Sequence, residues 1–145
     1  MSPTFSDGQY LIVDELTYRL EEPQRGDVII FHFPNNVKEY FIKRIIALPG
    51  ETISIVGGKI KIINNENKEG FLLDESYINE KLSDMQAVTL SETDYFVMGD
   101  NRGASYDSRN WGLLSKDLIV GRAFIRLVPF KDAGIFPGKH EYTNE

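Results

Sequence analysis

Residues 54–61 read Ser54-Ile55-Val56-Gly57-Gly58-Lys59-Ile60-Lys61 and predict a β-hairpin. Two short runs rich in β-branched residues flank a pair of glycines. Glycine supplies the positive φ angles that a tight two-residue turn requires, so the turn is placed at Gly57 and Gly58. Similar strand-like runs lie on both sides of this hairpin, so the hairpin indicates a fold made mainly of β-strands.

The chain as a whole is predicted to be mainly β, as a partly open barrel or a coiled sandwich with minor helices. The expected strands are rich in Ile, Val, Phe and Tyr. Short helices are expected at Ser76 to Leu82 and after Ser115, which could cap Lys116 to Leu118. The polar segment from Asn64 to Asp84 is interpreted as an excursion from the barrel or sandwich, and the end of the chain as a tail that either wraps the surface or frays. The strands are expected at 9–14, 27–33, 40–47, 52–56, 59–64, 95–98 and 119–127.

Composition excludes several classes of function. The 145 residues fit one domain, and a net charge of -6 gives no electrostatic footprint for nucleic acid. There is no cysteine, and the two histidines, His32 and His140, are too far apart for a metal-binding motif, so we expect no metal and no cofactor. No apolar run reaches the roughly 18 residues of a membrane-spanning helix, so the chain by itself is expected to be soluble.

A lysine lies within an apolar strand in the segment from Tyr40 to Glu51. Strand alternation sends Lys43 and Arg44 to opposite faces, so at least one of the two cations shares a face with apolar neighbours. Burial without a carboxylate partner lowers the pKa of a lysine and makes it a general base near neutral pH. The alternative is that both side chains lie at an edge and extend their charged ends into water.

A polar loop, Gly99 to Arg109, follows the expected strand at Tyr95 to Met98. Asp107 and Arg109 are placed to pair through two parallel hydrogen bonds, and Ser105 to fix a neighbouring amine. Asp100 or Asn101 could close a turn through its side chain. Alternatives are a well-ordered turn with one salt bridge, or a cation site built from Asp94, Asp100 and Asp107, although their spacing matches no calcium loop.

These segments together resemble the bacterial type I signal peptidases. Met1 to Thr4 is similar to the end of the family signature Ser-Met-x-Pro-Thr, and Tyr40 to Gly50 is similar to its lysine box. The resemblance runs in order to about residue 130 and is carried also by Arg25 to Phe31, Gly99 to Arg109, Trp111-Gly112, Val120 to Ala123 and Arg126 to Pro129. It implies the family's partly open barrel, with a core of about 1–52 and 91–130, a short variable insertion at about 53–90 and a tail at 131–145, all in one peptidase domain.

Carried over by position, the resemblance implies a Ser/Lys catalytic dyad. Lys43 would be the general base, Ser105 would orient its amine, and Asp107, Arg109 and Asp100 would support them. Met1 and Pro3 would lie at the substrate groove. The serine nucleophile would stand directly before Met1, so we expect the 145 residues alone to be inactive; only a shift of the N-terminal segment would make Ser2 the nucleophile.

The implied activity is the removal of signal peptides from exported pre-proteins. The parent protein is expected in the bacterial cytoplasmic membrane, with a monomeric catalytic domain on its outer face. An apolar patch near the N-terminus and in Phe130 to Pro137 is expected to touch the lipid surface. Two alternatives stay open: a catalytically silent homologue that binds extended peptides, and a Ser/Lys autoprotease of the repressor-cleaving kind.

Overall fold

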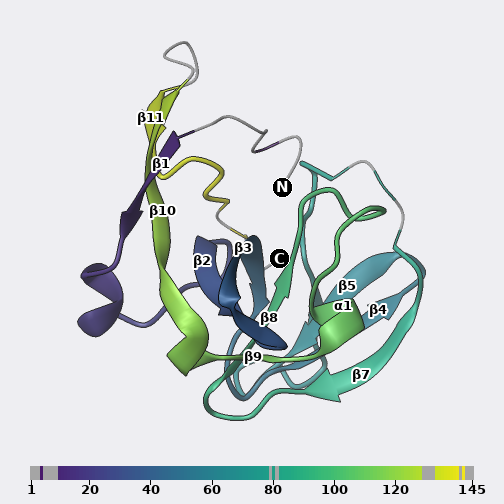
Figure 1. Cartoon of the computed structure of the whole chain (residues 1–145). Helices are drawn as coiled ribbons and strands as arrows, with labels where there is room; N and C mark the ends of the chain where they lie inside the picture. The colour runs from purple at the N-terminus through teal and green to yellow at the C-terminus, as the bar shows by residue number, and fades with distance from the viewer. Residues whose placement is uncertain are drawn as a thin grey trace.

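In a computed structural model, which describes residues 4, 10–78, 80, 82–128, 133–140 and 142, the chain forms two antiparallel sheets (Figure 1). For residues 126–128 only the backbone is described. The elements are β1 (Tyr10–Asp14), η1 (Thr17–Arg19), β2 (Val28–Phe33), β3 (Asn36–Ala47), β4 (Thr52–Val56), β5 (Lys59–Ile63), β6 (Phe71–Leu72), β7 (Met85–Thr89), β8 (Asp94–Met98), α1 (Ser108–Trp111), β9 (Leu114–Ser115), η2 (Lys116–Leu118), β10 (Ile119–Val128) and β11 (Gly134–Ile135).

The larger sheet has the strand order β1-β10-β2-β3-β8-β9, and β11 adds to β10. The smaller sheet has the order β6-β5-β4-β7 and lies on the other side of β3 and β8 from β1 (Figure 1). The larger sheet does not close on itself within the described residues, since β1 and β9 end the order. The predicted mainly β, partly open architecture is therefore confirmed.

β3 is the strand on which both sides of the core depend. Alternation sends Ile45 into a cluster with Ile29, Phe31, Tyr95 and Val97. Its neighbours face a second cluster, which extends to the smaller sheet and contains Ile46, Ala47, Ile53, Ile55, Ile60, Ile62, Phe96 and Met98. A side chain near this end of β3 is therefore shielded from water whichever way it points.

The Gly57-Gly58 hairpin is confirmed. Both glycines have positive φ, 59° and 79°, and β4 and β5 pair in register from Val56 and Lys59 outward. The seven expected strands are all present among the described residues, although β3 begins four residues before Tyr40. The expectation missed β7 and the two-residue strands β6, β9 and β11, which are too short or too polar to stand out.

The helix expected at Ser76 to Leu82 is wrong for the described residues of that segment. The chain makes one turn there, closed by the amide of Ile78 on the carbonyl of Glu75 at 2.8 Å, and then continues irregularly. Tertiary contacts override the weak helical pattern, because Glu75 forms an ion pair with Arg102 and Tyr77 packs on the end of the chain. After Ser115 a 3-10 turn does form as η2, but the Ser115 hydroxyl makes no capping hydrogen bond.

The C-terminal segment packs back onto the domain, as expected for a tail that wraps the surface. β11 pairs with β10, Pro137 is buried, and Tyr142 packs against the core between the two sheets. The expected membrane-contacting stretch is described only from residue 133, since Phe130 lies outside the described residues.

Candidate active site

Lys43 extends from β3 into a hollow of about 390 Å³ between the strand and the loop that follows β8. Its amine lies 5.5 Å from the ring centre of Phe41, and no carboxylate or other acceptor among the described residues pairs with it. Burial lowers the pKa of Lys43; the charges of Asp107 and Asp100 oppose this effect, and that of Arg109 adds to it. An unpaired amine with a lowered pKa can accept a proton, as a general base must.

Ser105 lines the same hollow as Lys43. Its hydroxyl oxygen is buried and has no hydrogen-bond partner within the described part of the chain. It packs against Gly99, where even one added methyl group would overlap the Ser105 side chain and touch that of Lys43. Glycine at position 99 thus lets the lysine and the serine share one hollow. They do not form a hydrogen bond with each other, so the orienting role of Ser105 stays a prediction.

Asp107 and Arg109 form the predicted two-point pair. Arg109 Nε and Nη2 donate to the two carboxylate oxygens of Asp107, each at 2.8 Å, and Asp107 also accepts the backbone amide of Gly99 at 3.1 Å. Burial by itself would raise the pKa of the Asp107 carboxyl, but hydrogen bonds from Arg109 and Gly99, together with the nearby Ser105 hydroxyl, lower it overall. The Ser105 hydroxyl thus lies near this carboxylate, although no contact between them has full hydrogen-bond geometry. The pair fixes the loop that carries Ser105.

The same carboxylate starts helix α1. Asp107 accepts the backbone amide of Arg109, and the side chain of Asn110 accepts the amide of Asp107, so the two ends form a capping box. The side chain of Asn101 accepts the amide of Ala104 at 3.2 Å, which closes the expected turn. Most of the polar side chains of the loop therefore form hydrogen bonds that stabilise its conformation.

Arg44, on the opposite face of β3 from Lys43, forms a fully buried pair with Asp100. Arg44 Nε and Nη2 donate to the two carboxylate oxygens at 2.8 and 2.7 Å, and the side chains are 2% and 0% exposed. The edge alternative is therefore wrong for Arg44. The hydroxyl of Thr4 also donates to Asp100, which ties the N-terminal segment to the loop after β8.

A second buried pair was missed from the sequence. Arg102 donates to both carboxylate oxygens of Glu75 at 2.7 and 2.5 Å and to the carbonyl of Gly99 at 3.1 Å. The partners are 27 residues apart, and Glu75 lies in a polar stretch without strand or helix periodicity. No local pattern could have indicated it.

The alternative cation site is wrong, because its three carboxylates are engaged separately. Asp100 pairs with Arg44, Asp107 pairs with Arg109, and Asp94 accepts the hydroxyl of Ser91 at 2.7 Å. Across the described ranges, no three His, Asp or Glu side chains gather as a metal site would require.

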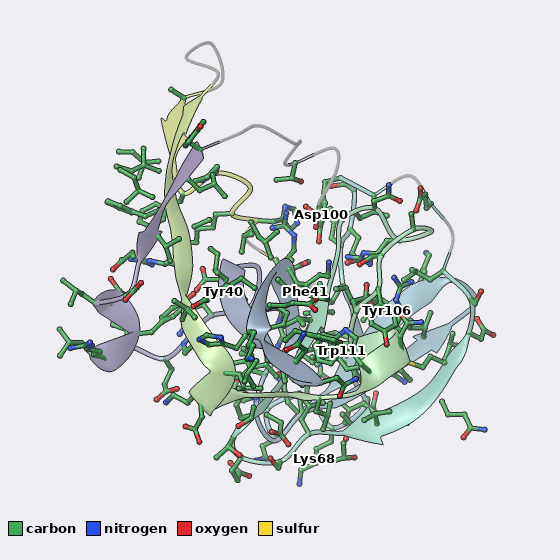
Figure 2. All side chains as sticks on the ribbon, in the orientation of Figure 1. Tyr40, Phe41, Lys68, Asp100, Tyr106 and Trp111 are labelled. Carbon is green, nitrogen blue, oxygen red and sulfur yellow. The ribbon has the colours of Figure 1, made fainter. Side chains whose placement is uncertain are left out.

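The aromatic residues Tyr40, Phe41 and Tyr106 line the Lys43 hollow. Figure 2 labels these three residues and Trp111. Phe33 stacks on Phe41 with ring centres 4.5 Å apart, and it meets the edges of Tyr106 and Trp111 at 6.0 Å each. Tyr106 is 51% exposed. The hollow therefore opens beside a surface suited to an extended peptide with apolar side chains.

Met1 and Pro3, the expected groove residues, lie outside the described residues, as does Ser2. Among the residues that the structure describes, no helix is long and apolar enough to cross a membrane.

Comparison with known proteins identifies the family. The sequence profile of the family described as "Signal peptidase, peptidase S26" matches residues 1–128. A probable signal peptidase I-2 from Synechocystis sp. is 35% identical over 93% of this chain, and a signal peptidase I from Leptolyngbya laminosa is 38% identical over 92%. The chain spans 62% and 67% of those two proteins.

A solved structure agrees. The crystal structure of a signal peptidase I from Enterococcus faecalis has a TM-score of 0.60 and 33% identity, covering 70% of this chain and 97% of that one. With the order of its boxes, its open β architecture and these relatives, the chain belongs to the signal peptidase family.

Proposed function

We propose that this chain is the catalytic part of a serine endopeptidase that removes signal peptides, with Lys43 as the general base. One observation carries the proposal: an unpaired, half-buried amine with a lowered pKa lies beside Ser105 in a hollow bordered by aromatic rings. Such an amine is rare unless it has a function, because an isolated lysine is otherwise placed in water.

The reaction proceeds in two steps. Neutral Lys43 takes the proton of a serine hydroxyl, whose oxygen attacks the scissile carbonyl; the resulting ammonium protonates the leaving amine as the peptide bond breaks. Lys43 then takes a proton from water, whose oxygen attacks the acyl ester, and it returns that proton to the serine oxygen as the ester bond breaks. From the resemblance of Met1 to Thr4 we propose that this serine stands directly before Met1, and that its backbone N–H helps to stabilise the oxyanion.

The neighbouring groups support this chemistry through position and charge. Ser105 lines the same hollow as Lys43 and is proposed to direct its amine, since its unsatisfied hydroxyl is available for that contact. Asp107 and Arg109 hold the Ser105 loop, and the Arg44–Asp100 pair holds Thr4. These neighbours are therefore proposed as positioning residues, whereas Lys43 is proposed as the base.

Substrates are proposed to be pre-proteins that reach the site from a membrane surface. The exposed side chains of Ile12 and Ile135 lie on either side of Ile125 in a cross-strand row, because Ile12 pairs with Ile125 and Ile125 pairs with Ile135. Tyr10, also exposed, continues this row along β1. We call Tyr10, Ile12, Ile125 and Ile135 the apolar row and propose that it contacts lipid.

Cleavage by an extended chain tests the proposal. Adding the upstream residues, with serine before Met1, should confer cleavage of a signal-peptide substrate, and the 145 residues alone should give none. In the extended chain Lys43→Ala should abolish cleavage, because the hydroxyl and the base act as one unit. Lys59→Ala, at an exposed lysine on β5, is the matched control and should retain full activity.

Two results would contradict the proposal. Cleavage by the 145 residues that is abolished by Ser2→Ala would make Ser2 the nucleophile. An extended chain that binds the peptide without cleaving it would instead identify a silent homologue.

A further inference from the structure

The segment beyond β10 contacts the buried ion pair behind the site. We call residues 133–140 together with Tyr142 the C-terminal strap. It begins with β11 on β10 and then runs back to β3, as the yellow segment of Figure 1 shows. The family match ends at residue 128, so the strap lies outside the part of the chain that the family profile covers.

The strap supplies a hydrogen-bond acceptor to Arg44. Arg44 Nε and Nη2 are taken up by Asp100, which leaves Nη1. This nitrogen donates to two carbonyl oxygens, that of Gly26 at 3.0 Å and that of Gly138 on the strap. A buried guanidinium is tolerated only when its donors are largely satisfied, and the strap provides the acceptor for the second N–H of Nη1.

Gly26 permits this close approach. It has a φ of 90°, and a side chain at that position would overlap the backbone carbonyl of His140. The strap therefore packs directly on the backbone just before β2, without an intervening side chain. This contact seals the Arg44 side of the pair from water.

The strap also fixes the ring that covers Arg44. The guanidinium carbon of Arg44 lies 4.8 Å from the ring centre of Tyr77. The hydroxyls of Tyr77 and Tyr142 are 2.6 Å apart, and the His140 ring packs against both tyrosines, with centres 4.5 and 4.7 Å away. Burial raises the pKa of Tyr142 to about 12, so its hydroxyl keeps its proton at neutral pH.

The Arg44–Asp100 ion pair, which contacts the strap through Arg44, contacts the N-terminal segment through Asp100. Asp100, held by Arg44, accepts the hydroxyl of Thr4. Under the proposed function the nucleophile precedes Met1, only a few residues from Thr4, so the position of Asp100 bears on the distance between the nucleophile and Lys43. Misplacement of a reacting group by about 1 Å can reduce a rate by about a hundredfold.

From these contacts we infer that the C-terminal strap is a positioning element of the active site, acting through Arg44 and Asp100 on Thr4. Tyr142 and Tyr77 are its positioning residues. This inference rests on the proposed function for its effect on rate, but the closure of the ion pair is measurable without catalysis.

Kinetics of the extended chain give the first test. Tyr142→Phe removes one hydroxyl and keeps the ring, and it should lower kcat about fivefold while leaving KM unchanged, because Thr4 is held less firmly and the substrate surface is untouched. Tyr77→Phe removes the same hydrogen bond and also the 3.4 Å contact of the Tyr77 hydroxyl with Glu75, so it should lower kcat at least as much. The double variant should lose no more than Tyr77→Phe alone, because Tyr142→Phe removes no contact that Tyr77→Phe leaves.

Thr89→Val is the matched control. It deletes an exposed hydroxyl–hydroxyl hydrogen bond, the 2.8 Å contact with Thr52 in the smaller sheet, and should leave kcat and KM unchanged. Unaltered kcat in both tyrosine variants, or equal losses in Thr89→Val, would overturn the inference.

Hydrogen exchange of arginine side chains gives the second test and does not require cleavage. In Tyr142→Phe the Arg44 Nε–H should exchange with solvent at least about tenfold faster than in the parent chain, whereas the Arg109 Nε–H, bonded to Asp107, should not change. An unchanged exchange rate of the Arg44 Nε–H would refute the positioning role of the strap. If the extended parent chain fails to cleave while Tyr142→Phe still shows the faster exchange at Arg44, the proposed function alone is contradicted.

Discussion

Asp100→Asn should lower the free energy of unfolding by about 3–5 kcal/mol, the range for removing one partner of a buried ion pair. The magnitude follows from the burial of the pair, because the Arg44 and Asp100 side chains are 2% and 0% exposed. The substitution leaves the Arg44 charge without a counterion in a place that water does not reach. For a domain of this length the loss corresponds to a fall in Tm of roughly 10–16 °C.

Urea titration is the suitable assay, since urea is uncharged and does not screen ion pairs. Trp111 is the only tryptophan and packs on Phe31 and Phe33, so its fluorescence reports loss of the core beside the site. Glu22→Gln is the control, because it removes the same kind of charge from a solvent-exposed pair with Lys116. That control should lose about 1 kcal/mol or less.

The reasoning fails if Asp100→Asn loses no more stability than Glu22→Gln. A further check is the double variant Arg44→Met/Asp100→Leu, which leaves no unpaired charge. It should be less destabilised than Asp100→Asn, because apolar side chains can replace a buried pair at little loss.

Three further predictions concern the loop, acid stability and the membrane. Ser105→Ala in the extended chain should reduce kcat by about a hundredfold with the fold intact, as for loss of a group that orients a base; unchanged kcat would remove Ser105 from the site. Because the pKa of Asp107 is lowered in the folded chain, its contribution to stability is present above the unfolded pKa of about 3.9 and is lost as pH falls through the lower folded value. The difference in free energy of unfolding between the parent and Asp107→Asn, measured in urea, should therefore shrink between about pH 6 and about pH 3. A constant difference would contradict this prediction. The chain should float with liposomes more than a variant with Ile12→Ser and Ile135→Ser in the apolar row; equal flotation would remove lipid contact through this row.

Local patterns were enough to predict seven of the eleven strands in the described part of the chain and one ion pair. The turn at Gly57 and Gly58 follows from backbone sterics alone, and Asp107 and Arg109 are two residues apart on one loop. The first residues of β3, Asn36 to Glu39, were missed because three of the four are polar and all are exposed at the hairpin end. Elements could therefore be predicted from the sequence where they are determined by residues that are close together in the chain.

Contacts between distant segments could not be predicted in the same way. Alternation along β3 predicted that one of the two cations would be desolvated but did not identify Asp100, 56 residues away, as the partner of Arg44. The helix expected at Ser76 to Leu82 was wrong because Glu75 and Tyr77 serve tertiary contacts. Likewise, the sequence around Gly26 gives no sign that the strap packs on this residue, where a side chain would overlap the carbonyl of His140.

The dependence of cleavage rate on pH tests the central claim most directly, because it reports the protonation of Lys43 itself. In the extended chain kcat/KM should rise with pH as the amine loses its proton, with a midpoint well below the ordinary lysine value of about 10.4. Arg109→Met should move the midpoint to higher pH, since it removes a positive charge that lowers the pKa of Lys43 and leaves Asp107 unpaired. A rate that does not rise through such a midpoint, or that persists in Lys43→Ala, would contradict the account.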